Sequence, residues 1–452
     1  MDNRANFGSR LGIVLATAGS AVGLGNVWRF PTMTGENGGA AFILIYIICV
    51  VVLGIPCMLS EFVIGRRAQA NTARAYSKLA GGRPWRFIGY FGVLTGFLIA
   101  SYYCVVSGWC LEYVAASVGD GLSGDAKSVA QYFTDFVFVQ NPWRAVMWLV
   151  IFFAITHFVI VKGVEKGIER ASKLMMPVLF VLLLIIVVAS CMLPGAGAGI
   201  RFLFSPDFSK IDSNVLLGAM GQAFFSLSVG MGALVTYSSY FSRDTHLLKS
   251  ATQIVAIDSL IAILAGLMIF PAVFSVGGKV DEGASLVFIT LPNVFNQAFA
   301  GMPLLGHAIA VLFFVLLAVA ALTSLISLHE TCTAFIHEEY RLSRARAATV
   351  VTVVGATLGV FCALSFCHAD LSFFGLSLFD LFDFTTGQLF LPLGGFLTSL
   401  FVGWYVPRHI VREELTNQGT LRGRFVGLYL FCVRYVCPIG ILLIFLHQMK
   451  VI

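Results

Sequence analysis

The chain has 452 residues, of which 58% are hydrophobic and only 12% are charged, and its formal net charge is +6. Soluble globular proteins carry roughly 25% charged residues, so this composition excludes an ordinary soluble enzyme, a disordered chain and a coiled coil. The positive charge does not indicate a nucleic-acid partner, because membrane proteins collect basic residues on their cytoplasmic side. The sequence therefore predicts an integral membrane protein.

Long apolar segments follow one another along the whole chain. A membrane-spanning helix needs about 20 mostly apolar residues. The pattern predicts eleven such helices, in one membrane domain over 1–452, at 11–36, 41–65, 87–117, 143–161, 167–192, 214–240, 246–276, 304–339, 346–366, 374–406 and 425–448. The connecting segments are too short to contain a separate folded core.

The placement of the basic residues indicates the orientation in the membrane. With a cytoplasmic N-terminus, 21 of the 29 lysine and arginine residues fall in cytoplasmic segments and 6 in external ones. The remaining two, Arg29 and Arg434, lie inside predicted spans. Basic residues concentrate on the cytoplasmic side of membrane proteins, so the N-terminus is expected in the cytoplasm. An odd number of spans then puts the C-terminus outside.

Two predicted spans contain closely spaced glycines at mid-membrane, in GSAVGLGNVWRFP (19–31) and FFSLSVGMGALVTY (224–237). Glycine is the poorest helix former after proline, so both helices are expected to break. Close packing through small residues is the alternative explanation for either segment alone. Because the two spans are five apart and oppositely oriented, together they favour an inverted repeat of about 7–192 and 214–406. The helix at about 425–448 lies outside it.

A broken helix exposes unpaired amides and carbonyls inside the membrane, where each needs a partner. The amides, at a positive helix end, suit a carboxylate, and the carbonyls suit a hard cation. This chemistry favours a transporter of an anionic or zwitterionic solute together with a metal ion.

The segment SAVGLGNVWRFP, followed by GENGGAAF, resembles the first span of the neurotransmitter:sodium symporter family. GIPCMLSEFVIGR, SYYCVVSGW, KGIERASKLMMP, GQAFFSLSVGMG and ALTSLIS resemble its second, third, fifth, sixth and eighth spans. A twelfth span and a long glycosylated external loop, present in many members, are not found in this sequence, which makes it similar to the short bacterial amino-acid transporters. The resemblance implies an all-α protein of a bacterial plasma membrane.

The resemblance also implies two sodium sites made of oxygen ligands, which hard cations prefer. The first would combine the substrate carboxylate with Ala21, Asn26, Ser226 and Asp258. The second would contain Gly19, Val22, Ala320, Thr323 and Ser324. Hydrogen bonding of the two hydroxyls within their own helix is the alternative. Chloride-dependent members have Asn and Ser where this chain has Asp258 and Ala262, so no chloride requirement is expected.

For the substrate, the resemblance implies a mostly apolar pocket. Its residues would be Ala21, Gly23, Leu24, Gly25, Ile99, Tyr103, Phe225, Ser226, Ser228, Met231, Ser324 and Leu328. Gly23 stands where monoamine carriers have an acid, which implies an amino-acid substrate. Because Met231 is flexible, hydrophobic side chains up to aromatic size are expected. Plain packing is the alternative for Phe225 and Met231.

The family pairs charged residues as gates on both sides of the substrate. The resemblance implies an outer pair of Arg29 and Asp383 with Phe225 as a lid. The inner pair would be Arg4 and Glu338, near Tyr240 and Phe7, although Glu338 and Phe7 depart from the commonest family residues. A solvated terminal charge is the alternative for Arg4.

The expected function is therefore sodium-coupled import of hydrophobic L-amino acids, aromatic ones included, by alternating access. The alternative is a non-transporting amino-acid receptor or channel with the same fold. An enzyme is not expected, because the sequence has no HExxH, Ser-Lys or paired-Asp set at a suitable depth. Neither a disulfide nor a Cys or His metal site is expected. Glu61 is expected near the first break, whereas the sequence assigns no role to Glu112, Glu330 or Arg434.

Overall fold

The computed structural model describes residues 6–119, 121, 122, 124, 126–139, 142–278, 286–368 and 371–448. These residues are mostly helical. In the first part of the chain the α-helices are α1 (Arg10–Ala21), α2 (Phe30–Glu36), α3 (Ala40–Cys49), α4 (Ile55–Ala68), α5 (Thr72–Ala80), α6 (Phe87–Val118), α7 (Ala126–Thr134), α8 (Pro142–Val161) and α9 (Arg170–Cys191).

The rest of the chain adds twelve helices and one hairpin to the described structure. The helices are α10 (Ala196–Phe204), α11 (Ser213–Ser226), α12 (Ala233–Ser238), α13 (Leu247–Ser275), α14 (Leu291–Ala298), α15 (Pro303–Glu339), α16 (Arg344–Leu364), α17 (Leu378–Phe384), α18 (Leu391–Leu400), α19 (Arg408–Leu415), α20 (Val426–Phe431) and α21 (Cys437–Gln448). The antiparallel strands are β1 (Ser372–Phe373) and β2 (Leu376–Ser377), with Ser372 opposite Ser377.

Short 3₁₀ and π-helical turns extend or join many of these helices. The 3₁₀ turns are Pro84–Arg86 and Phe208–Lys210. The π-helical turns are Gly25–Arg29, Val50–Gly54, Asp135–Val139, Val164–Glu169, Leu286–Thr290, Thr385–Phe390, Phe401–Tyr405 and Cys432–Val436.

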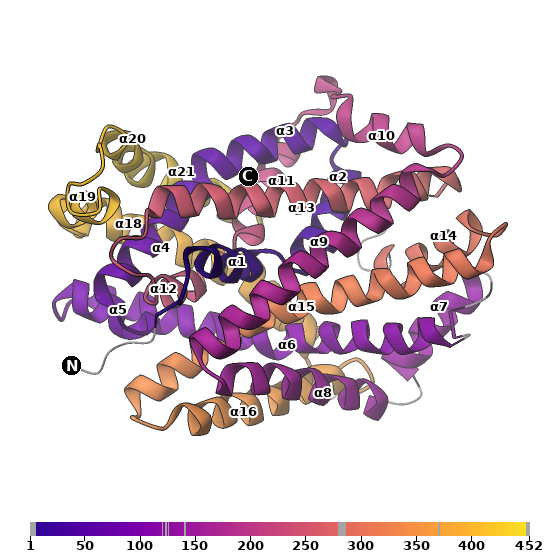
Figure 1. Cartoon of the computed structure of the whole chain (residues 1–452), viewed down its shortest axis with the longest axis horizontal. Helices are drawn as coiled ribbons and strands as arrows, with labels where there is room; N and C mark the ends of the chain where they lie inside the picture. The colour runs from indigo at the N-terminus through magenta and orange to yellow at the C-terminus, as the bar shows by residue number, and fades with distance from the viewer. Residues whose placement is uncertain are drawn as a thin grey trace.

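The long helices run roughly along one common direction (Figure 1). Among the described residues, nine helices are long and apolar enough to cross a membrane, and Arg10–Ala21 with Gly25–Glu36 forms a tenth span that bends by 55°. The predicted sixth span consists of α11 and α12, which are too short to qualify individually, so the total of eleven stays a prediction. Helices α5 and α19 lie at one end of the molecule, and α7, α10 and α14 at the other (Figure 1).

The structure confirms both predicted helix breaks. Helix α1 ends at Ala21, and Val22 is extended with φ −71° and ψ 109°. Between α11 and α12, Ser228, Gly230 and Gly232 have φ of 54°, 95° and 76°. This left-handed conformation suits glycine, which lacks a Cβ. At Gly230 the space also requires glycine, because a Cβ would lie 2.4 Å from the carbonyl oxygen of Leu391.

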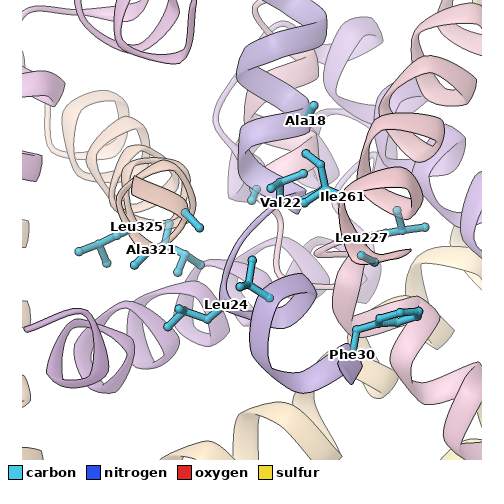
Figure 2. Close-up of a cluster of buried hydrophobic side chains, with 14 of the residues drawn as sticks. Ala18, Val22, Leu24, Phe30, Leu227, Ile261, Ala321 and Leu325 are labelled. Atoms are coloured by element: carbon cyan, nitrogen blue, oxygen red, sulfur yellow. The ribbon is translucent and has the colours of Figure 1, made fainter. Parts of the chain in front are cut away.

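Apolar side chains surround the first break and hold it in place. Figure 2 shows Val22 and Leu24 on the unwound chain, beside Ala321 and Leu325 of α15. Leu227, from the second break, also belongs to this buried cluster. In a membrane, lipid tails are as apolar as leucine, so close van der Waals packing stabilises such contacts. The breaks are therefore fixed structural features at the centre of the helix bundle.

Glu112 joins α6 to α8. It accepts hydrogen bonds from Arg144 Nε at 3.0 Å and from Trp148 Nε1 at 2.5 Å, and the hydroxyl of Tyr132 donates to it as well. The residue is fully buried. Three side chains thus donate to one buried carboxylate, so Glu112 has a structural role that the sequence did not reveal.

Glu330 has an equivalent structural role between α15 and α16. Arg344 donates to both of its carboxylate oxygens, at 3.0 and 2.5 Å, and the hydroxyl of Tyr240 donates to Oε1 at 2.7 Å. Arg434 in turn donates to the carbonyl oxygen of Gly403 at 2.6 Å and lies over the ring of Trp404. These contacts provide the partners that charged groups require inside a membrane.

Candidate functional site

The first polar cluster lies where the first break meets α3, α11 and α13. Asn26 Nδ2 donates to Asp258 Oδ1 at 2.7 Å, and Ser226 Oγ donates to Asp258 Oδ2 at 2.8 Å. The hydroxyl of Tyr46 lies 3.3 Å from both Ser226 Oγ and Asp258 Oδ2. All four residues are buried. This site concentrates a carboxylate, hydroxyls and a side-chain amide within hydrogen-bonding distance of one another.

The first break positions Asn26. The amide of Gly23 donates to Asn26 Oδ1 at 3.1 Å, and Gln222 Nε2 donates to the carbonyl oxygen of Gly25 at 3.2 Å. Polar side chains thus satisfy the backbone groups that the break releases. An amide oxygen has two lone pairs, so Asn26 Oδ1 can contact a cation while it accepts the bond from Gly23. The oxygen atoms in this cluster could serve as ligands for sodium, which prefers oxygen ligands.

The second oxygen cluster joins α15 to the first break. Thr323 Oγ1 donates to the carbonyl oxygens of Val22 at 3.1 Å and of Ala320 at 2.9 Å, and Ser324 Oγ donates to that of Val22 at 3.3 Å. The Thr323 hydroxyl therefore bonds both within its own helix and across to the first break. A Cβ added to Gly19 would lie 3.3 Å from Thr323 Cβ, so these helices approach closely here. These oxygens also form a set suited to sodium.

A small cavity of about 50 Å³ adjoins both polar clusters, through Gly23, whose amide bonds Asn26, and through Ser324. Ten of the twelve residues predicted for the substrate pocket line it, namely Ala21, Gly23, Gly25, Ile99, Tyr103, Phe225, Ser228, Met231, Ser324 and Leu328. Of the other two, Ser226 belongs to the first polar cluster, and Leu24 lines an adjacent cavity while its amide donates to the hydroxyl of Tyr103 at 3.2 Å. The structure thus brings the predicted residues together.

Sequence reasoning missed three further residues of this cavity, Ser20, Tyr102 and Leu391. Ser20 lies within the glycine-rich segment, and its carbonyl oxygen accepts a hydrogen bond from Ser228 Oγ at 3.1 Å. That position, beside the predicted break, was a usable signal. Leu391 begins α18, far away in sequence, and no pattern along the chain connects it with the site.

A larger cavity of about 220 Å³ adjoins the small one, and both Arg29 and Asp383 line it. The guanidinium of Arg29 lies 4.1 Å from the centre of the Phe225 ring. The two charged residues interact electrostatically, but among the ion pairs of the described residues none joins them within 4.0 Å. Phe225 lines both cavities and lies between them. The predicted outer gate residues therefore meet at this cavity without a direct ion pair.

The predicted inner gate lies only partly within the described residues, and its pairing stays a prediction. Arg4 lies outside the described residues. Glu338 accepts hydrogen bonds from the backbone amide and Nδ2 of Asn71, at 2.9 and 3.0 Å, and Asn71 caps α5. The hydroxyl of Tyr240 donates to Glu330 Oε1 at 2.7 Å. Phe7 packs edge-on against Tyr240 with ring centres 6.0 Å apart, so the segment before α1 is attached to this region.

Glu61, which the sequence analysis expects near the first break, contacts the second break. Its Oε1 accepts a hydrogen bond from the amide of Gly230 at 2.6 Å, because α4 packs against α12. Glu61 is buried, and its Oε2 has no partner among the described residues. Its carboxylate therefore satisfies a backbone amide that the second break releases.

Comparisons with known proteins agree with this geometry. The profile of the sodium:neurotransmitter symporter family matches residues 4–135 and 135–452. A Bacillus subtilis protein named "Uncharacterized sodium-dependent transporter YhdH" is 38% identical over 449 residues, which cover 99% of this chain and 98% of that protein. An uncharacterized sodium-dependent transporter from Haemophilus influenzae is 36% identical, with 99% and 98% covered.

The crystal structure of MhsT in complex with L-phenylalanine shares the fold. It has a TM-score of 0.88 and 42% sequence identity, and the match covers 99% of this chain and 100% of MhsT. These similarities confirm the resemblance that the sequence motifs carried, and they identify a membrane transporter rather than an enzyme. The chain is a multi-pass, sodium-dependent transporter that belongs to the sodium:neurotransmitter symporter family.

Proposed function

We propose that this transporter imports hydrophobic L-amino acids, aromatic ones included, together with two sodium ions. The observation that carries the proposal is that the small cavity adjoins both oxygen clusters, through Gly23, whose amide bonds Asn26, and through Ser324. A substrate carboxylate bound by the amides of Leu24 and Gly25 and by the Tyr103 hydroxyl would lie beside Asn26. There it would complete the shell of the first sodium ion, so that substrate and ion bind together.

The lining of the small cavity favours a neutral, apolar side chain. Of the described residues that line it, none carries a charge, and most of its side-chain surface comes from groups such as Ile99, Met231 and Leu328. A flexible methionine adapts to side chains of different size. The solved complex of MhsT with L-phenylalanine, from a protein 42% identical to this one, supports an aromatic substrate here too.

Two sodium ions with a zwitterionic substrate would carry two charges inward. Each charge gains about 2.3 kcal/mol per 100 mV of membrane potential, which is sufficient to concentrate a neutral solute. In the proposed orientation the N-terminus lies in the cytoplasm of a bacterial cell, eleven spans cross the plasma membrane, and the C-terminus lies outside. The two repeats, at about 7–192 and 214–406, would move relative to each other during alternating access.

Ligand competition tests the proposed substrate class. Purified protein would bind labelled L-phenylalanine in sodium but not in choline, and L-leucine and L-tryptophan would displace the label. Tryptamine, which lacks the carboxylate, would not displace it, because it leaves both the sodium shell and the Leu24 amide without a partner. Equal displacement by tryptophan and tryptamine, or binding without sodium, would contradict the proposal.

A further inference from the structure

A third cavity, larger than the two already described, lies at the outer surface of the bundle, away from the two breaks. Its volume is about 280 Å³, and it separates the first turns of α1 and α13. Its walls include Arg10, Leu11 and Val14 from α1, Lys249 and Gln253 from α13, and His246, the N-cap of α13. In the proposed orientation this is the cytoplasmic end of both helices.

The polar side of the cavity presents two positively charged side chains, Arg10 and Lys249, and the ring of His246. The backbone amide of Lys249 donates to His246 Nδ1 at 3.2 Å, so the ring proton resides on Nε2, which is left to donate. Among the described residues, no carboxylate forms an ion pair with Lys249. Arg10 pairs with Asp244 at 3.3 Å, but both side chains are largely exposed, at 83% and 68%.

An exposed pair of this kind contributes little stability, so a bound anion can displace it. Hydrogen bonds from Ser242 and from Arg10 hold the pKa of Asp244 below its usual range. The cavity therefore has two basic side chains, Arg10 and Lys249, and the His246 donor. Asp244, which pairs with Arg10, is the acid beside them.

Two side chains hold the loop that precedes α13 in position. Arg66 Nη1 donates to the carbonyl oxygen of Thr245 at 2.5 Å, and Asn417 Nδ2 donates to that of Asp244 at 3.2 Å. Arg66 is itself buried and paired with Glu414 at 2.7 Å. The wall formed by this loop is thus held in position before any ligand binds, which lowers the entropic cost of binding.

The level of the cavity in the membrane favours a lipid as the ligand. Both adjoining helices are apolar spans that begin here, at Arg10 and Leu247. Leu11 on α1 and Leu260 further along α13 are exposed, at 62% and 47%, so an apolar surface continues from the basic side chains toward the membrane interior. A headgroup phosphate can thus contact the basic residues while its acyl chains lie along the helices.

We infer that this cavity binds the headgroup of an anionic phospholipid of the cytoplasmic leaflet. The lipid joins the start of α1 to the start of α13. Helix α1 carries Gly19 and leads into Val22, and α13 carries Asp258. The lipid therefore connects the first turns of two helices that contribute residues to the proposed sodium sites. Bound lipid is expected to stabilise the packing of α1 against α13.

Titration of the purified protein in detergent, with native mass spectrometry as the readout, tests this site. The ligands are short-chain phosphatidylglycerol, short-chain phosphatidylcholine and inorganic phosphate. The variant is Arg10→Gln with Lys249→Gln, both exposed positions that leave the core unchanged. The matched control is Arg346→Gln, an exposed basic residue near the start of α16, also at the end of an apolar span.

The wild type is expected to bind phosphatidylglycerol more tightly than phosphatidylcholine, without displacement by equimolar phosphate. The double variant should bind phosphatidylglycerol roughly thirtyfold more weakly, because each basic residue near the surface contributes about fivefold. The control should bind like the wild type. Unchanged binding by the double variant, an equal loss in the control, or displacement by phosphate would each overturn the inference. Amino-acid binding is not part of the readout, so the result is independent of the proposed substrate.

Discussion

Asp258 is the residue that determines the proposed dependence on ions. Its carboxylate is the one fixed negative charge in the polar cluster with Asn26 and Ser226, and Ala262, one helical turn further along α13, has no hydroxyl to offer an anion. Asp258→Asn keeps the size and removes the charge. Contacts with a charged group contribute ~1.5–3 kcal/mol, so sodium affinity should fall about tenfold to a hundredfold, or chloride should become necessary.

Sodium titrations of phenylalanine binding, in chloride and in gluconate, check this expectation. The wild type should behave identically in both anions. Asp207→Asn, in an exposed turn, is the matched control and should bind like the wild type. A wild-type protein that loses binding in gluconate would show that Asp258 does not replace chloride.

Gly23 is tightly enclosed at the first break. A Cβ at this position would lie 2.3 Å from Ser324 Oγ and 3.0 Å from the hydroxyl of Tyr103. Gly23→Ala should therefore weaken sodium-dependent phenylalanine binding by roughly tenfold, since added volume in a packed site costs ~1–3 kcal/mol. Gly427→Ala is the control, because its Cβ would meet no atom within 4 Å. Equal affinities of the two variants would show that Gly23 is not part of the binding site.

At the residue scale, the sequence predicted most of the cavity because the motifs at the two breaks contain much of its lining. It missed Tyr102 and Leu391, which reach the cavity only through the packing of α6 and α18. It also could not identify partners for Glu112 or Glu330, because those partners lie on neighbouring helices. Such contacts depend on three-dimensional packing rather than on a local pattern.

At the scale of elements, the start of α9 is the segment expected to move during transport. It is preceded by the π-helical turn Val164–Glu169. Glu169 accepts hydrogen bonds from the amide of Gly8 at 2.6 Å and from Ser9 Oγ at 2.8 Å, and it pairs with Lys173 at 2.6 Å. One carboxylate thus attaches the segment before α1 to the fifth span. Unwinding there would release α1 and open a path for water to Thr323.

Pro177 lies inside α9 and has no amide to donate to the carbonyl of Lys173. Pro177→Ala restores a hydrogen bond that contributes ~0.5–1.5 kcal/mol, so uptake should slow about fivefold while equilibrium phenylalanine binding stays nearly unchanged. Amide hydrogen exchange over 167–176 should be faster in the inward-facing state.

Pro271→Ala, at an internal proline of α13, serves as the control and should not change exchange at 167–176. Full transport by Pro177→Ala, together with uniformly slow exchange over 167–176, would mean that Pro177 is a static kink and that α9 does not unwind.

Among the elements, long apolar helices were predictable and short polar ones were not. The expected spans at 87–117 and 304–339 correspond to α6 and α15 almost residue for residue. The expected span at 374–406 was wrong at its start, because residues 372–377 form a hairpin before α17 begins. Helices α5 and α19 were not predicted either. Hydropathy detects burial in lipid over about 20 residues, and these elements are too short and too polar for that signal.

At the scale of the whole molecule, the fold brings its two breaks together at the centre of the bundle. The described spans surround a small cavity that adjoins both oxygen clusters, and a larger cavity lies beyond Phe225. A receptor with this site would bind amino acids without moving them, and a channel would only equilibrate them. A symporter instead has to use the energy of the sodium gradient.

Uptake of labelled L-phenylalanine into proteoliposomes is the most direct test of sodium-coupled amino-acid transport by this protein. With high sodium outside and potassium inside, the vesicles should accumulate phenylalanine well above its external concentration. A sodium ionophore should collapse this accumulation, and an inside-negative potential should increase it, since about 2.3 kcal/mol is gained per charge per 100 mV. Uptake that only reaches the external concentration, or that proceeds equally in choline, would contradict sodium-coupled symport.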